Sequence, residues 1–117
     1  MSLPVCAGRL FYGRKGVFMI LRRWHGRVPN AKAADYLHLM TTVALPDYRA
    51  TPGNIDALCC SRIEGDVTHI ETMTLWESED AIRAFAGDMV LRAKYYDTDA
   101  EYLLEMEDEV LHFEAMR

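Results

Sequence analysis

The chain has 117 residues, half of them hydrophobic, which predicts one domain with a core of its own. Its formal net charge is −5 and it has no cluster of lysine and arginine, so binding to nucleic acid or to an anionic membrane surface is not expected. No apolar run is long enough to span a membrane. Charged residues interrupt the apolar stretches near the start, so no signal peptide is expected either. We therefore predict a cytoplasmic protein.

Cysteine and histidine spacing predicts no metal site and no disulfide. Cys6, Cys59 and Cys60 form no CxxC motif, and adjacent strand residues point to opposite faces. We interpret the three cysteines as small buried hydrophobic residues in a reducing compartment. The four histidines lie far apart in the sequence and lack the spacing of metal ligands.

The first predicted strand covers residues 17–25, which are rich in β-forming residues, and it is expected to end at Gly26. The residues before it, 1–16, are expected to form an extension. The folded domain is therefore predicted to cover residues 17–117.

A helix is predicted next, from about residue 31 to residue 45, with Asn30 as its N-cap. Pro46 is expected to end this helix, because proline cannot donate to the helical ladder. Residues 47–54 contain a Pro-Gly pair and are predicted to form a loop.

A hairpin follows, with strands over residues 55–63 and 67–76 and a tight turn at 64–66. Ser78 is the expected N-cap of a second helix, and Gly87 is its expected C-cap.

The remaining chain is predicted to hold a helical turn within residues 88–99, another within 100–105, and a last strand over 109–116. The element order is then β-α-β-β-α-β. This order predicts a ferredoxin-like α+β fold, with a four-stranded antiparallel sheet and two helices on one face.

Both faces of this sheet carry apolar residues. In the strand 67–76, Met73 and Leu75 lie on one face while Ile70 and Trp76 lie on the other. The helices can cover one face only, so we expect a second copy to cover the other in a sheet-on-sheet homodimer. The alternative is an imperfect alternation that has no functional meaning.

The segment from Leu75 to Gly87, LWESEDAIRAFAG, resembles the strand-to-helix corner of the antibiotic-biosynthesis monooxygenase family. Segments 48–54, 93–97 and 110–114 are similar to uncharacterised members of that family. The resemblance covers about residues 18–115 and implies the dimeric α/β-barrel arrangement. Its motifs are structural corners, so they indicate the fold more than the reaction.

The family includes cofactor-free monooxygenases of polyphenolic compounds, haem-degrading enzymes and many proteins of unknown activity. In the haem-degrading branch, a second tryptophan follows the corner tryptophan after nine residues, and a haem-ligating histidine follows ten residues later. Counting from Trp76 gives Phe85 and Tyr95 instead. Haem degradation is therefore disfavoured.

The resemblance implies a cofactor-independent monooxygenase-like protein that acts on a small aromatic or quinol-type compound. Such chemistry needs a group that deprotonates a phenol and donors for the developing oxyanion. His25, His69 and His112 are the catalytic candidates, because histidine titrates near neutral pH. His38 is expected at the helix surface. Each catalytic candidate is also explained, without any catalytic role, as a solvated or hydrogen-bonded strand residue.

The candidate ligand-binding residues carry aromatic rings or hydrogen-bond donors. They are Arg23, Trp24, Tyr36, Asn54, Trp76 and Tyr95. Arg23 and Trp24 adjoin His25 at the predicted mouth of a pocket. Trp76 also suits a packing role, and Asn54 suits a turn.

Two other functions remain open at this point. One is a non-catalytic small-ligand-binding or stress-associated homodimer on the same fold, because a fold alone does not establish chemistry. The other is an isomerase or a decarboxylase, since related barrels carry other small-molecule chemistry.

Overall fold

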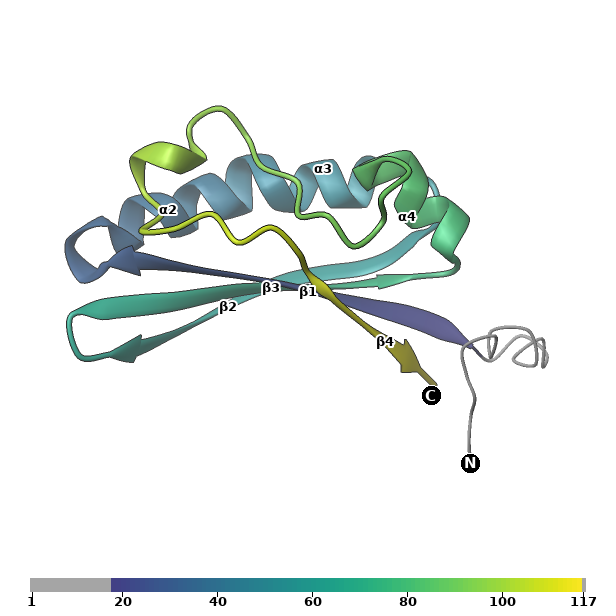
Figure 1. Ribbon diagram of the computed structural model, residues 1–117, viewed down its shortest axis with the longest axis horizontal. Coiled ribbons are helices and arrows are strands. Elements are labelled where there is room, and N and C mark those ends of the chain that lie inside the picture. Colours follow the sequence, from purple (N-terminus) through teal and green to yellow (C-terminus); the bar gives the residue numbers. More distant parts are fainter. Residues whose placement is uncertain (1–17, 117) are drawn as a thin grey trace.

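The computed structural model describes residues 18–116. Its sheet has four antiparallel strands in the order β2-β3-β1-β4, with the helices on one face (Figure 1). The strands are β1 (Met19–Pro29), β2 (Asn54–Glu64), β3 (Val67–Trp76) and β4 (Leu111–Ala115). This topology confirms the predicted ferredoxin-like α+β fold. The predicted extension over residues 1–16 lies outside the described residues.

A long helical stretch follows β1 and crosses the sheet. It is built from η1 (Asn30–Lys32), α2 (Ala33–Leu39), the π-helical turn η2 (Met40–Ala44) and α3 (Leu45–Ala50). Among residues 18–116 no helix is both long enough and apolar enough to cross a membrane.

The helix continues through Pro46 to Ala50, so the predicted end at Pro46 is wrong, and of the loop predicted over 47–54 only residues 51–53 are outside a helix or strand. In η2 the backbone N–H of Leu45 donates to Met40 O, five residues back. This wider turn passes directly into α3, where Pro46 occupies the first turn. A proline is tolerated there because its missing N–H is not required.

Asn30 does not act as the predicted N-cap. No side chain caps η1; instead, the Asn30 amide donates to Gly65 O and accepts from the Thr68 hydroxyl. Asn30 therefore ties the start of the helical stretch to the β2–β3 turn.

The second helix, α4 (Glu79–Ala86), has the predicted caps. The Ala81 N–H donates to Ser78 Oγ at 3.1 Å, and Gly87 ends the helix with a φ of 95°. Residues 87–110, which we call the strap, run back along the helical side of the sheet to β4 (Figure 1). The strap contains one short 3₁₀ turn, η3 (Asp99–Glu101), so the helical turn predicted within 88–99 is not formed.

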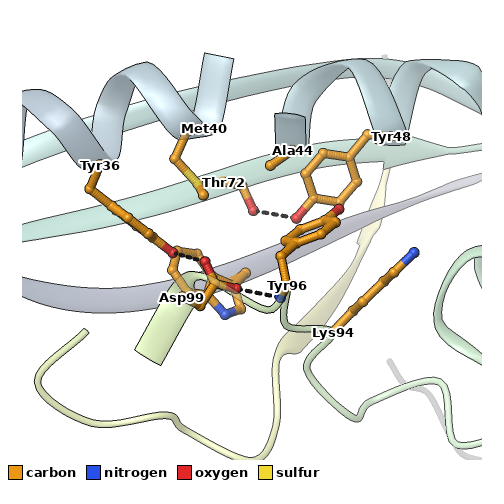
Figure 2. Close-up of a pocket in the computed structure, with 9 residues that line it drawn as sticks. Tyr36, Met40, Ala44, Tyr48, Thr72, Lys94, Tyr96 and Asp99 are labelled. Carbon is orange, nitrogen blue, oxygen red and sulfur yellow. Dashed lines mark hydrogen bonds between the residues drawn. The ribbon is translucent and has the colours of Figure 1, made fainter. Parts of the chain in front are cut away.

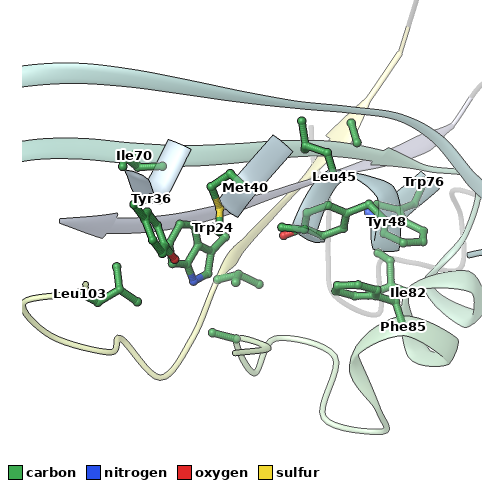
Figure 3. Close-up of a cluster of buried hydrophobic side chains, with 14 of the residues drawn as sticks. Trp24, Tyr36, Met40, Leu45, Tyr48, Ile70, Trp76, Ile82, Phe85 and Leu103 are labelled. Atoms are coloured by element: carbon green, nitrogen blue, oxygen red, sulfur yellow. The ribbon is translucent and has the colours of Figure 1, made fainter. Parts of the chain in front are cut away.

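Alternate residues of β1 and β3 point into the core beneath the helices (Figure 3). The β1 strand continues through Gly26, contrary to the prediction that it ends there. A glycine is present at this position because the Trp24 indole and Leu103 lie directly over it. A Cβ at Gly26 would lie 2.6 Å from Trp24 Cη2 and 2.7 Å from Leu103 Cδ2. Gly26 is thus required by close packing and does not end the strand.

Cys60 is exposed, so the prediction that it is a buried residue is wrong. Cys59 is half-buried on the helical side, and burial raises the pKa of its thiol to about 11. Cys6 lies outside the described residues.

The fully buried Trp76 anchors the corner between β3 and α4. Its Nε1–H donates to Thr74 Oγ1 at 2.8 Å, and its ring contacts Tyr48 and Phe85. We expect Trp76→Ala to lower the free energy of unfolding by about 3–5 kcal/mol, because it leaves a large cavity. Urea denaturation measures this loss, and Trp76→Phe should lose less. A Trp76→Ala variant as stable as the parent would contradict the packing role.

Candidate functional site

A small pocket lies between the sheet, the helical stretch and the strap (Figure 2). Its lining comes from all three parts of the fold: Trp24 and Thr72 from the sheet, Tyr36, Met40, Ala44 and Tyr48 from the helices, and Lys94, Tyr96 and Asp99 from the strap. The cavity has a volume of about 10 Å³, which is room for about one water molecule.

The carboxylate of Asp99 joins the strap to the helical stretch. Its Oδ1 accepts the Tyr36 hydroxyl at 2.9 Å, and its Oδ2 accepts the Tyr96 backbone N–H at 2.6 Å (Figure 2). Burial raises the pKa of Asp99 despite these two hydrogen bonds. Burial, and then the nearby Asp99 charge, also raise the pKa of Tyr36. Tyr36 is therefore a neutral phenol whose proton is directed at a carboxylate.

A second carboxylate, Asp47 of α3, holds the strap at another point. Its Oδ2 accepts the Tyr96 hydroxyl at 2.6 Å and Lys94 Nζ at 3.1 Å. Burial alone would raise the pKa of Asp47, but these hydrogen bonds outweigh it and lower that pKa. Because both Tyr36 and Tyr96 donate to carboxylates, each hydroxyl oxygen keeps a lone pair that can accept from a ligand.

Trp24 supplies the complementary donor. The residue is 6% exposed, and its Nε1–H makes no hydrogen bond of ordinary geometry among the described residues. The indole does lie near the Tyr95 hydroxyl, where it partly offsets the burial that raises the pKa of Tyr95. A buried donor without a partner costs about 1–3 kcal/mol. The pocket therefore combines one unused donor with acceptors on two tyrosines, a set that suits a ligand carrying hydroxyl or carbonyl oxygens.

A buried cation lies beside the pocket. Arg22 is 2% exposed and donates to Val90 O, to Arg92 O at 3.0 Å and to His112 Nε2 at 3.1 Å. No carboxylate pairs with it among residues 18–116. Burial lowers the pKa of Arg22, yet an arginine remains charged. Its positive field reaches Tyr48, where it opposes the stronger effect of burial, which raises the Tyr48 pKa.

Of the predicted ligand-binding residues, Trp24 and Tyr36 line the pocket. Tyr95 packs against Trp24, with ring centroids 6.2 Å apart, and donates its hydroxyl to Glu107 O. Trp76 belongs to the core, and the Asn54 amide at the start of β2 donates to the backbone carbonyls of Asp56 and Leu75.

The histidines do not line the pocket. His25 and His69, together with Arg23, lie on the sheet face that has no helices, because neighbours on a strand alternate between faces. His112 lies on the helical side beside Arg22, and His38 is exposed on α2. A catalytic role for any of them stays a prediction.

Sequence reasoning missed Arg22, Tyr48, Lys94 and Asp99, whereas Tyr96 is expected from sequence as a possible hydroxyl of the cavity wall and does line it. For Arg22 a signal existed, since a charged residue at an inward position of an alternating strand is unusual. The strap residues have no such signal, because apolar and polar residues do not alternate with a regular spacing along the strap. Among residues 18–116, no group of three or more His, Cys, Asp or Glu side chains is placed to hold a metal.

Comparison with solved structures shows which known fold the chain shares. A provisionally assigned antibiotic biosynthesis monooxygenase from Bacillus cereus is similar, with a TM-score of 0.53 and 14% identity, over 87% of this chain and 94% of that one. A monooxygenase of Streptomyces coelicolor from the gene ActVA-Orf6, in complex with nanaomycin D, gives a TM-score of 0.47 and 21% identity over 86% of each chain. No protein-family model and no curated protein matches the chain. The Bacillus structure shows that the fold is shared.

His112 makes stability depend on pH. Burial, and then the charge of Arg22, lower its pKa from 6.5 to about 4. Between these pH values the unfolded chain binds a proton that the folded protein does not, so the free energy of unfolding falls as the pH falls from about 6.5 to about 4. We expect His112→Gln to lose less stability than wild type over this range, in urea denaturation at about pH 7 and about pH 4.5.

The matched control is His38→Gln, which removes an exposed histidine and should keep the wild-type pH dependence. An equal loss in His112→Gln and wild type would show that His112 does not resist protonation in the folded protein.

Proposed function

We propose that the chain is a cofactor-independent monooxygenase-like enzyme that acts on a small hydroxylated aromatic compound of the quinol type. One observation carries the proposal: a pocket walled by aromatic rings holds the Trp24 indole donor, and the charge of the buried Arg22 behind it reaches Tyr48 in the pocket wall. The fold, shared with a provisionally assigned monooxygenase, supports it.

The pocket offers a route for a proton. A ligand hydroxyl can donate to Tyr36 Oη while Tyr36 passes its own proton to Asp99, whose raised pKa favours protonation. The aromatic anion that remains is stabilised by the Trp24 N–H and by the positive field of Arg22. Trp24 is fixed on β1 before the ligand arrives, so its donor needs no reorganisation as charge develops.

The electrons for oxygen come from the substrate. A quinol plus O₂ gives a hydroxyquinone plus water. One oxygen atom enters the ring, the other leaves as water, and the quinol supplies all four electrons. The reaction therefore balances without a further reductant.

Substrate entry requires the strap to move. A cavity of about 10 Å³ is far below the roughly 300 Å³ or more of ordinary ligand pockets. The carboxylates of Asp99 and Asp47 hold Tyr96 and Lys94 of the strap against the helices. Because the strap has little regular structure, it is the part of the lining that can open at least cost.

We also propose that the helix-free face of the sheet, which we call the open face, pairs with a second copy. Cross-strand neighbours make a continuous apolar patch at one end: Leu21, Leu58, Met73, Leu75, Leu111 and Phe113. At about 3.4 Å per residue and about 4.8 Å between strands, the sheet presents roughly 600 Å² in projection. The side chains that project from the sheet raise its accessible area towards the roughly 800 Å² that each partner buries in a stable interface.

Oxygen uptake with a panel of quinols tests the enzyme proposal. We expect turnover that places one atom of isotopically labelled O₂ in the product, and Tyr36→Phe should lower kcat by about 100-fold or more by breaking the proton route. Tyr102→Phe is the control, because Tyr102 packs against Tyr36 with its ring tilted and does not line the pocket. Quinol binding without oxygen uptake would instead support the ligand-binding alternative, and neither binding nor uptake would reject both.

Sedimentation tests the pairing. We expect a particle of twice the 13.4 kDa chain mass for wild type, and monomers for Phe113→Glu, because the new charge would be buried at the contact. Val43→Glu in η2 is the control, since Val43 is 39% exposed on the helical layer, away from the open face. A wild type that stays monomeric at high micromolar concentration would contradict the pairing.

A further inference from the structure

Four side chains form a continuous chain of contacts on the open face, outside the pocket. Glu107 Oε2 lies 2.7 Å from His25 Nδ1, His25 Nε2 lies 2.9 Å from His69 Nδ1, and His69 Nε2 lies 2.7 Å from Glu64 Oε1. The members come from the strap, β1, β3 and β2. Both imidazoles are largely buried, with side chains 18% and 15% exposed. We call this group the histidine chain.

A count of the N–H protons on the two imidazole rings shows that the contact between the rings needs one additional proton. An ionised carboxylate only accepts, so the outer contacts need an N–H at His25 Nδ1 and another at His69 Nε2. Each neutral imidazole carries a single N–H, so these two protons use up both rings. The inner nitrogens would then face each other with lone pairs at 2.9 Å. A third proton between them turns that repulsion into a hydrogen bond.

The inner distance favours a proton over a metal ion. Zinc binds histidine nitrogen at about 2.0–2.1 Å, so two ligands of one tetrahedral zinc lie about 3.3 Å apart. The distance between His25 Nε2 and His69 Nδ1 is shorter and fits a hydrogen bond. The described residues also offer no third ligand at this point.

We propose that the histidine chain binds one shared proton between His25 and His69, and that this proton strengthens pairing with a second copy across the open face. The second part rests on the pairing proposed above.

The charges around the chain give the direction of this effect. Arg23 pairs with Glu71 at 3.0 Å, Arg27 pairs with Glu105 at 2.6 Å, and Arg62 lies 3.9 Å from Glu64. Together with Glu107, these are three guanidinium groups and four carboxylates, which leave one negative charge.

The shared proton cancels that local charge. Asp56 lies on the same face, opposite Leu75 at its other end, so the face as a whole becomes less negative. Two identical faces repel less, and cost less to bury, when each carries a smaller net charge. Association is therefore linked to uptake of one proton by each copy, and it strengthens as the pH falls. The hydrogen bond from His69 lowers the pKa of Glu64, and the one from Arg27 lowers the pKa of Glu105, so these carboxylates stay ionised.

Sedimentation equilibrium between about pH 6 and about pH 8, where histidine titrates, tests the proposal on the full chain. We expect the dimer dissociation constant of wild type to rise about tenfold or more over this range. His69→Gln should show a dissociation constant that changes little with pH. His38→Gln removes a histidine away from the open face and should keep the wild-type dependence.

The outcomes separate the two proposals. A dimer whose dissociation constant does not change with pH, or changes equally in wild type and His69→Gln, overturns the linkage and leaves the pairing intact. A monomer at every pH overturns the pairing and the linkage together. Nitrogen-15 spectra of the histidine rings then test the shared proton alone, since two rings that titrate independently would overturn it.

Discussion

The strict alternation of side chains along β1 and β3 is the constraint on which both sites depend. Arg22 and Trp24 point towards the helices, so Arg23 and His25 must point the other way. The register with β3 then completes each set, placing Thr72 opposite Trp24 and Glu71 opposite His25. One layer of strands thus separates an aromatic pocket from a charged surface, and a shift of the register by one residue would destroy both.

Much of the fold was predictable because its signals are local. The bounds of β3, the Ser78 and Gly87 caps and the β2–β3 turn all follow from short stretches of sequence. The predictions at Gly26 and Pro46 fail because the neighbouring structure accommodates each residue inside its element. Gly26 makes room for the Trp24 ring, and Pro46 is accommodated by a π-helical turn, so neither ends its element. A glycine or proline considered alone in the sequence does not show whether its neighbours in the fold accommodate it within a strand or helix.

The pocket was only partly predictable. Trp24 and Tyr36 stood out as aromatic residues on predicted elements, but their use depends on Asp99, which reaches them from the irregular strap. Nothing periodic marks that carboxylate. The histidines were grouped by chemistry, whereas the fold sorts them by face. His25 and Trp24 are neighbours in sequence and lie on opposite sides of the sheet.

The strap contributes side chains to both sides of the sheet. Its Asp99 lies in the pocket, while Glu105 and Glu107 bond to Arg27 and His25 on the open face. This reach is possible because β4 pairs only with the first part of β1, so the strap runs beside the remaining edge, where Leu104 N–H donates to Arg27 O. Asp99 in the pocket and Glu107 at one end of the histidine chain therefore belong to the same short segment of backbone. The irregular course of that segment lets it supply a carboxylate to each side of the sheet, which a regular strand at this edge would do only at alternate residues.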